Sequence, residues 1–355
     1  MKYCGTILLA LSGAMLSATS AVAETAPPPW SAAPTTKVTA DGFIVENAGA
    51  SLAATLHLPA ANQPVAAVIV THGASSPLRS SPLYDHLIQM LPAMGIAVLT
   101  YDRRGSGEST GQAGTGDYAL LADDAIAGAR ALMKDPRIDP RRIGIWGLSQ
   151  GGWLALLAAS RSPDLAFAIS VSAPMVTPDV QMIFSSENSL RVNGYSQADI
   201  DQMVATRKAV DDYMRGTADR ATAQKMVDAA KVKPWYKYLY MGETVRDRAD
   251  SSWRREIEHD PLATVATVKV PTLVLFGAVD PWVPVATSVE RLKKLAPQMT
   301  AMDVAVIAGA DHRMQTSVTT MDQFDPSKSD AGGPEAPEYF ARLSQWLTER
   351  GIAAR

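Results

Sequence analysis

A stretch near the middle of the chain, residues 141–155, reads RRIGIWGLSQGGWLA. Its apolar run at residues 143–146 is typical of a strand, and the residues from Trp153 onward are good helix formers. Between them, residues 147–151 match the pattern G-x-S-x-G. In a strand–turn–helix context this pattern exposes a nucleophilic serine, here Ser149, at the apex of a sharp turn. Glycine is needed on both sides because a Cβ there would collide with the neighbouring strand or helix.

Apolar runs alternate with helical patterns on both sides of this stretch. Continuous apolar runs are typical of strands buried on both faces, so the alternation predicts an α/β fold with a mainly parallel sheet. An antiparallel hairpin is predicted at residues 42–58, with its turn at 47–49. The other strands are expected at residues 65–70, 96–100, 143–146, 166–171, 272–277 and 302–307, and helices at 84–94, 118–133, 284–295 and 339–347.

The alternation stops between residues 176 and 262, which are polar and helical in pattern. Ser196 and Asp199 resemble a capping box that begins a helix. Such a long connection is unusual within a compact domain and predicts an accessory domain. We therefore expect a core made of residues 36–175 and 263–355, interrupted by a helical cap at 176–262.

The N-terminal residues 1–23 have the pattern of a secretory signal peptide. Lys2 supplies a positive start, residues 7–16 are apolar but too few to span a bilayer stably, and Ala21-Val22-Ala23 is an A-x-A cleavage site. A retained membrane anchor is the alternative. Cleavage after Ala23 would remove Cys4, the only cysteine, leaving no disulfide or thiol chemistry. We expect a periplasmic or secreted protein with no stable membrane insertion after cleavage.

Composition and motifs argue against several classes of function. The net charge is −3 and no basic run occurs, so a nucleic-acid partner is not expected. No His, Cys or acidic cluster has metal-ligand spacing, so neither a metal nor another cofactor is expected. Gly105 and Gly107 suggest a dinucleotide loop, but Gly111 comes one residue too late for G-x-G-x-x-G. We expect the neighbouring Asp102 and Arg103 or Arg104 to bond the loops near Ser149 instead.

A serine nucleophile needs a base and an orienting acid. Of the five histidines, His312 follows the last predicted strand, and the carboxyl ends of parallel strands converge at one edge of a sheet. Asp280 follows the preceding predicted strand and preserves the order serine, acid, histidine. Asp179 is the alternative acid, whereas Asp311 is expected to be exposed or to cap its own loop.

Acyl transfer also needs two donors for the developing oxyanion. Gln150, which follows the serine, supplies one backbone N–H. The loop after the first buried strand, His72-Gly73-Ala74, is expected to supply the other from Ala74. The side chain of His72 is expected to brace this loop by hydrogen bonds.

Together these residues resemble the α/β-hydrolase superfamily over about residues 50–350. Within it, the chain is similar to the bacterial carboxylesterase, serine aminopeptidase and acyl-thioesterase-like branch. The resemblance implies a mainly parallel sheet of about eight strands, an inserted helical lid and no cofactor. The oxyanion loop is HGA rather than HGGG, so bulky tertiary-alcohol esters are less expected.

Three functions remain open. The first is hydrolysis of small to medium acyl or aryl esters through an acyl-enzyme on Ser149, with a small-molecule ester as the partner. In that case the cap residues Trp235, Tyr236 and Tyr238, together with Tyr240, either line the substrate pocket or pack the cap onto the core. The second is a periplasmic aminopeptidase, in which Glu187 or Glu243 would hold the substrate ammonium. The third is a binding protein that keeps the fold without turnover. The oligomeric state is not predicted.

Overall fold

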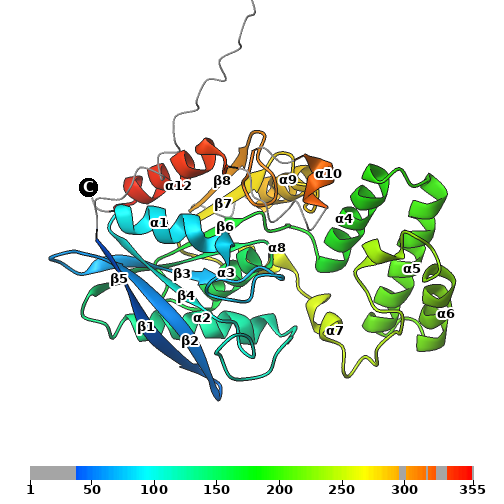
Figure 1. Ribbon diagram of the computed structural model, residues 1–355, viewed down its shortest axis with the longest axis horizontal. Helices are drawn as coiled ribbons and strands as arrows, with labels where there is room; N and C mark the ends of the chain where they lie inside the picture. Colours follow the sequence, from blue (N-terminus) through cyan, green and yellow to red (C-terminus); the bar gives the residue numbers. More distant parts are fainter. Residues whose placement is uncertain (1–36, 296–300, 317–318, 325–333, 354–355) are drawn as a thin grey trace, which may run out of the picture.

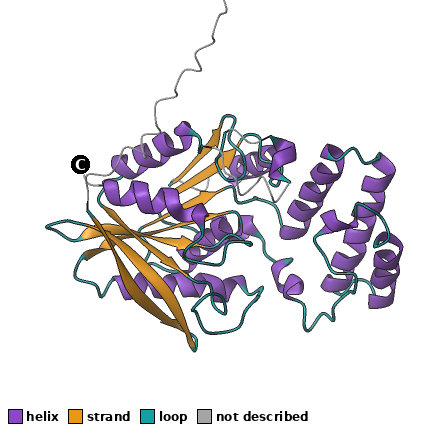
Figure 2. Cartoon of the chain, viewed as in Figure 1, coloured by secondary structure: helices purple, strands orange, loops and turns teal. Residues whose placement is uncertain are grey.

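The computed structural model describes residues 37–295, 301–316, 319–324 and 334–353. The predicted signal peptide and Cys4 lie outside these residues. One eight-stranded sheet, ordered β1-β2-β4-β3-β5-β6-β7-β8, runs through the molecule (Figure 1; Figure 2). The pairs β1–β2 and β2–β4 are antiparallel and all others are parallel. The predicted α/β class with a mainly parallel sheet is therefore confirmed. The strands are β1 (Val38–Asn47), β2 (Ala50–Pro59), β3 (Val65–Thr71), β4 (Ile96–Tyr101), β5 (Ile138–Leu148), β6 (Phe167–Val171), β7 (Thr272–Gly277) and β8 (Met302–Ile307).

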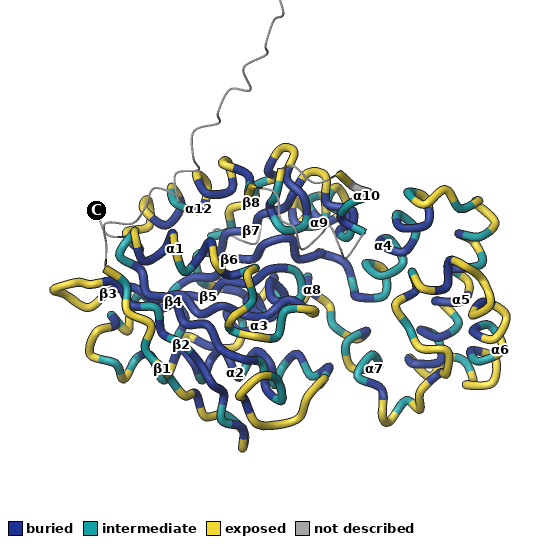
Figure 3. Tube along the Cα trace, in the orientation of Figure 1, coloured by how far each residue is buried: buried dark blue, intermediate teal, exposed yellow. Residues whose placement is uncertain are grey.

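The central strands are covered by helices on both faces, which explains their continuous apolar sequences. Every residue of β3, β4, β6 and β7 is buried (Figure 3). One face packs on α1 (Asp85–Ala93) and α12 (Pro337–Glu349). The other face packs on α2 (Tyr118–Leu132), α3 (Gln150–Arg161) and α9 (Val285–Leu295). Two short helices, η1 (Pro82–Tyr84) and α10 (Thr320–Gln323), lie in connecting segments.

The predicted N-terminal hairpin is confirmed. Asn47 pairs with Ala50, so a two-residue turn joins β1 to β2. Both turn residues have positive φ, 46° at Ala48 and 74° at Gly49. This is the geometry of a type I′ turn, whose twist matches that of the flanking strands.

The connection from β6 to β7 forms helices that lie beside the sheet rather than on it (Figure 1). The expected capping box is present, because Ser196 and Asp199 bond each other's backbone N–H groups at the start of α5. These helices share a hydrophobic cluster of their own, separate from those that cover the sheet. None of the described helices is both long and apolar enough to cross a bilayer. The helices that share this cluster are α4 (Pro178–Val192), α5 (Gln197–Arg215), α6 (Arg220–Ala230), η2 (Tyr236–Leu239) and α7 (Ser252–Glu256). The last helix of the connection, α8 (Pro261–Val265), instead packs on the core through Val265.

A buried ion pair ties the loop after β4 to α2. Arg104 Nε donates to Asp124 Oδ2 at 2.7 Å, and the Arg104 Nη2 group bonds the other carboxylate oxygen. Asn47 from the hairpin turn also donates to Asp124, at 2.8 Å. The two charged side chains are only 4% and 1% exposed. Such a pair depends on both partners, because either charge alone would remain buried without compensation.

We expect Arg104→Met to destabilise the fold by about 3–5 kcal/mol, because it leaves the Asp124 carboxylate buried without its partner. The matched control is Arg130→Met, which removes an ion pair with Asp164 whose arginine is 63% exposed. We expect that variant to lose no more than about 1 kcal/mol. Urea unfolding of both variants measures the difference, and equal losses would contradict this account.

The histidine of α1 is a core residue that stays neutral. His86 lies 3.1 Å from the hydroxyl of Tyr339 and packs edge-on against the rings of Trp146 and Phe340. Burial lowers the pKa of His86 to about 4. The unfolded chain therefore binds a proton at pH 5 to 6 that the folded protein does not, so stability falls as the pH drops through this range.

A His86→Gln variant should show a weaker loss of stability between pH 6.5 and pH 4.5. The difference in slope should approach one proton, or about 1.4 kcal/mol per pH unit. Unfolding free energies measured in urea at several pH values test this, with wild type and variant compared at each pH. Parallel pH profiles would show that His86 does not stay neutral in the folded protein.

Candidate active site

Ser149 occupies a strained turn between β5 and α3. Its backbone φ is 59° and ψ is −123°, a conformation that a residue with a side chain rarely adopts. The Ser149 N–H donates to the carbonyl of Val171 at the end of β6, at 2.8 Å. The turn thus places Ser149 at the carboxyl edge of the sheet, at the start of a helix.

The turn is possible only because its flanking residues lack a Cβ. A Cβ on Gly147 would lie 2.0 Å from the carbonyl oxygen of Gly151, and one on Gly151 would lie 2.6 Å from the carbonyl oxygen of Thr71. The hydroxyl of Thr71 sits between the two arms of the turn, 3.0 Å from Trp146 O and 2.8 Å from Gly151 O. The collisions expected from the sequence are therefore present at both glycines.

Asp280 and His312, which follow β7 and β8, lie together at the same edge. His312 Nδ1 and Asp280 Oδ2 are 2.7 Å apart. The other carboxylate oxygen of Asp280 accepts from the backbone N–H groups of Trp282 and Val283, at 2.8 and 3.1 Å. The Asp280 side chain is fully buried, whereas that of His312 is 18% exposed. An acid fixed by its own loop thus orients an imidazole that remains accessible.

Ser149 and His312 share no hydrogen bond in the described part of the chain. The contact between nucleophile and base is commonly long without substrate and tightens when substrate binds. The imidazole contact with Asp280 uses Nδ1, so Nε2 is the nitrogen suited to take the Ser149 proton.

The two other candidate acids are engaged elsewhere. Asp179, at the start of α4, pairs with Arg215 at 2.8 Å within the inserted helices. Asp311 accepts from the backbone N–H groups of Arg313 and Gln315, at 2.8 and 2.7 Å. Asp311 thus caps its own loop, which is one of the two roles expected of it.

The loop after β3 lies against the turn at Ser149. A Cβ on Gly73 would lie 3.5 Å from the carbonyl oxygen of Leu148, so the two segments are in contact. His72 braces this loop through Nε2, which donates to the carbonyl of Tyr101 at 2.5 Å. Burial, with a smaller effect of the Arg103 charge, lowers the pKa of His72 to about 3. His72 is therefore a neutral structural residue, and Ala74 follows it in the position expected of an oxyanion donor.

Arg103 connects the two segments that carry the proposed oxyanion donors. Its Nη2 group lies 3.1 Å from both His72 O and Gly73 O, and 2.8 Å from Gln150 Oε1. The Gln150 amide also donates to the hydroxyl of Tyr118 at 3.1 Å. Burial lowers the pKa of the Arg103 guanidinium. A partly buried cation that donates to neutral acceptors on both sides of the site fixes the spacing of these two segments.

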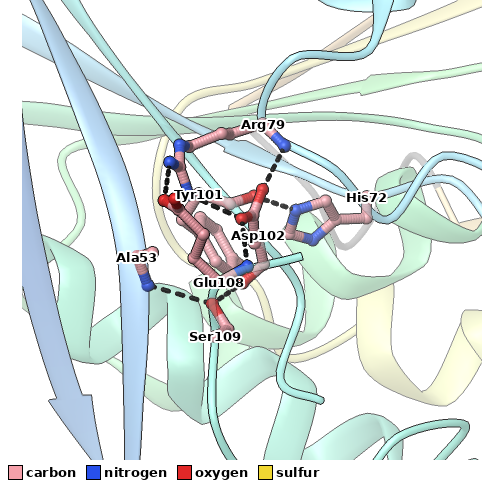
Figure 4. A network of polar contacts seen from close by, with 7 residues as sticks. All are labelled: Ala53, His72, Arg79, Tyr101, Asp102, Glu108 and Ser109. Carbon is pink, nitrogen blue, oxygen red and sulfur yellow. Dashed lines mark hydrogen bonds and ion pairs between the residues drawn. The ribbon is translucent and has the colours of Figure 1, made fainter. Parts of the chain in front are cut away.

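A second polar network holds the loop that carries Arg103 (Figure 4). Asp102 accepts from Arg79 Nη1 at 2.5 Å and from the backbone N–H of Glu108 at 2.9 Å. The Ser109 hydroxyl donates to the Asp102 carbonyl at 2.7 Å and accepts from the Ala53 N–H at 2.9 Å. The loop is therefore anchored to β2, which fits the structural role expected of Asp102.

The aromatic residues of the inserted segment pack among themselves. Trp235 is 1% exposed within the hydrophobic cluster of these helices, and its indole donates to Asp199 at 3.1 Å. Tyr236 is also buried there, and its hydroxyl donates to Gly242 O at 2.8 Å. Tyr238 stacks under the ammonium of Lys237 at 4.9 Å. These contacts lie within the cap itself, so they fit neither of the two roles left open, which were lining the pocket and packing the cap onto the core.

Sequence reasoning grouped Tyr240 with the other aromatic residues of the cap, and it missed Trp282 and Phe324. The rings of Tyr240 and Trp282 lie 5.8 Å apart, and those of Trp282 and Phe324 lie 4.7 Å apart. Trp282 is two residues from Asp280, which was the one signal available in the sequence.

The comparisons with known proteins agree with this arrangement. The family model for serine aminopeptidase, S33, matches residues 62–316. An uncharacterized 31.7 kDa protein of the traX-finO intergenic region of Escherichia coli is 26% identical over 64% of this chain and 77% of its own length. The thiohydrolase apmlB of Arthrinium phaeospermum is 32% identical, over 30% of this chain and 34% of its own length.

Solved structures show the same fold. The Pyrococcus furiosus esterase Pf2001 superposes with a TM-score of 0.54 at 16% identity, covering 88% of this chain and 91% of the esterase. The DcsB structure with its substrate analogue gives a TM-score of 0.56 at 15% identity, covering 88% of this chain and 99% of DcsB. The fold and site define an α/β-hydrolase, as the sequence resemblance implied. The chain belongs to the serine aminopeptidase S33 family of serine hydrolases.

If Arg103 sets the spacing of the two donor segments, Arg103→Met should lower kcat by about ten- to a hundredfold, less than complete loss of one oxyanion donor. KM should change little, because the effect is on the transition state rather than on substrate binding. Steady-state kinetics measures this, with Arg161→Met as a control because that arginine pairs with Asp123 at the surface. An equal fall in both variants, or a change in KM alone, would count against the positioning role.

Proposed function

We propose that this protein hydrolyses carboxylic esters with small to medium acyl or aryl groups, through an acyl-enzyme on Ser149. Ser149 Oγ attacks the acyl carbon while His312 Nε2 accepts its proton. The backbone N–H groups of Ala74 and Gln150 bind the oxyanion. His312 then protonates the leaving alcohol, and water releases the acid by the reverse sequence.

The observation that carries this proposal is the Asp280–His312 pair. The 2.7 Å contact directs one carboxylate oxygen at Nδ1, and two backbone N–H groups hold the other oxygen. Such an acid keeps the imidazole in the tautomer that accepts a proton at Nε2 and stabilises the imidazolium that forms. Ser149 in its strained turn, also at the carboxyl edge of the sheet, is the hydroxyl that this pair would activate.

The second candidate is an aminopeptidase, which the description of the family favours. This activity needs an acid near the site to hold the substrate ammonium. Glu187 lies 3.6 Å from Arg191 on the same helix, and Glu243 is exposed. Glu256 in α7 interacts electrostatically with Arg103, but burial raises its pKa and disfavours the charge that an ammonium requires. These surroundings support the esterase as the leading proposal.

Ser149→Ala should lower kcat on p-nitrophenyl acetate by about 10⁴-fold or more, because the nucleophile is lost. His312→Ala should cause a loss of similar size, and the double variant should be no worse than either, since the two act as a unit. Ester turnover that is retained in Ser149→Ala would contradict the assignment of Ser149 as the nucleophile. Both variants should retain the wild-type melting temperature to within a few degrees.

A comparison of leaving groups separates the three functions. Wild type should cleave p-nitrophenyl acetate faster than alanine p-nitroanilide, and the opposite order would favour the aminopeptidase. A fluorophosphonate probe should label wild type but not Ser149→Ala. A folded wild-type protein that takes no label and cleaves neither substrate would fit the binding protein instead.

A further inference from the structure

Three aromatic side chains from distant parts of the sequence form a continuous surface beside the Asp280–His312 pair. Trp282 comes from the loop after β7, Phe324 directly follows α10, and Tyr240 ends η2. The rings are tilted against each other at 51° and 56°, so they form a connected row. We call Tyr240, Trp282 and Phe324 the aromatic row.

The row is attached to the catalytic residues at two points. The backbone N–H of Trp282 donates to Asp280 Oδ1 at 2.8 Å, so the residue that carries the indole also helps to fix the acid. Gln323, which precedes Phe324, accepts from the backbone N–H of His312 at 3.4 Å. Figure 1 places α10 on the side of the core that faces α4. The row therefore lies at the junction of the core and the inserted helices, next to the acid and the base.

The residues of the row remain accessible, unlike Trp235 and Tyr236 of the inserted segment. Tyr240 is 49% exposed, and Trp282 and Phe324 are partly exposed. Trp235 and Tyr236 are turned into the cluster of the inserted helices and are almost fully buried. Aromatic side chains contribute large apolar areas, so leaving three of them together in contact with water is costly unless a ligand covers them.

The backbone at Tyr240 holds its ring in this position. Tyr240 has a left-handed conformation, with φ 51° and ψ 37°. Residues other than glycine, asparagine and aspartate seldom adopt it, and it is costly for a bulky side chain. It ends η2 and directs the Tyr240 ring toward Trp282 instead of into the cluster that buries Leu239.

Two side chains of α4 hold the backbone at Trp282 from the other side. Gln181 donates to the carbonyl of Trp282 at 3.0 Å, and Asn188 donates to that of Pro281 at 2.9 Å. These bonds tie the acid loop to the inserted helices through main-chain atoms. The main chain at Trp282 is thus held by bonds that do not involve the indole, whose contacts are with the rings of Tyr240 and Phe324.

The geometry points to the aromatic row as the subsite that binds a flat apolar group of the substrate, preferably an aryl ring. This inference rests on the proposed ester hydrolysis, and the ring would belong either to the acyl part or to the alcohol part of the ester. Flat rings stack on tilted aromatic side chains with a gain beyond that of the buried area. The row contains no charged group, so a charged substituent at this position would bind poorly.

Two pairs of substrates distinguish the two sources of the ring. The acyl pair is p-nitrophenyl acetate and p-nitrophenyl 3-phenylpropanoate, and the alcohol pair is ethyl acetate and 2-phenylethyl acetate, followed by pH-stat. We expect wild type to favour the phenyl member of one pair by about tenfold or more in kcat/KM. The ratio within each pair is the quantity of interest, because it cancels changes common to both substrates.

Trp282→Leu and Phe324→Leu should each reduce that ratio by about tenfold, mainly through KM. Tyr240→Asn should reduce it less, because Tyr240, unlike Trp282 and Phe324, is not linked to Asp280 or His312 by its own or a neighbouring residue. It is also the variant safest for folding, since asparagine tolerates the left-handed conformation. The matched control is Trp235→Phe, an aromatic residue of the same segment outside the row, which should leave the ratio unchanged. Melting temperatures identify any variant whose fold is impaired.

A wild type without phenyl preference in either pair, or a preference that all three row variants retain, overturns the inference. Failure of the proposed function gives a different result, the absence of turnover of every ester by wild type. In that case calorimetry with 4-phenylbutan-2-one, a ketone that cannot be hydrolysed, tests the row alone. Binding by wild type that Trp282→Leu weakens tenfold supports the subsite, and no binding, or equal binding by both, overturns it.

Discussion

The turn that carries Ser149 depends on the lack of space around it. Its two arms approach so closely that a single added carbon at Gly147 would overlap the carbonyl of Gly151. The same contact brings β3, β5 and the start of α3 together through the hydroxyl of Thr71. Because the packed arms leave the turn no other conformation, the strain at Ser149 persists in the folded protein. The positions of the oxyanion loop and of the helix N-terminus both follow from this packing.

The polar residues around the turn divide into those that hold loops and those suited to chemistry. His72 and Asp102 are buried and Arg103 is partly buried, and all three are bonded to neighbouring backbone groups. His312 differs from them, since its imidazole is bonded on one side and partly exposed on the other. A largely buried, hydrogen-bonded polar network resists movement, which keeps the segments around Ser149 in fixed positions.

Much of the sheet and of the candidate site could be predicted from the sequence, because each strand and the residue that follows it form a pattern within a short segment. Ser149, Asp280 and His312 each follow an apolar strand, and parallel strands present such residues at one edge. The aromatic row could not be read in this way. Its members are neighbours only after folding, whereas the clustered aromatics at Trp235 and Tyr236 suggested a pocket wall but are turned into the interior of the inserted helices. Helical periodicity within so short a segment does not say which face meets the core.

The loop after β7 uses its main chain and its side chains for different purposes. The N–H groups of Trp282 and Val283 hold the acid, and every residue except proline supplies such a group. The indole of Trp282 takes no part in that contact. A change of side chain at this position would therefore leave the orientation of Asp280 intact. Under the proposed role of the aromatic row, substrate preference can thus diverge among descendants of this protein by single substitutions at Trp282, while the position of the acid is inherited unchanged.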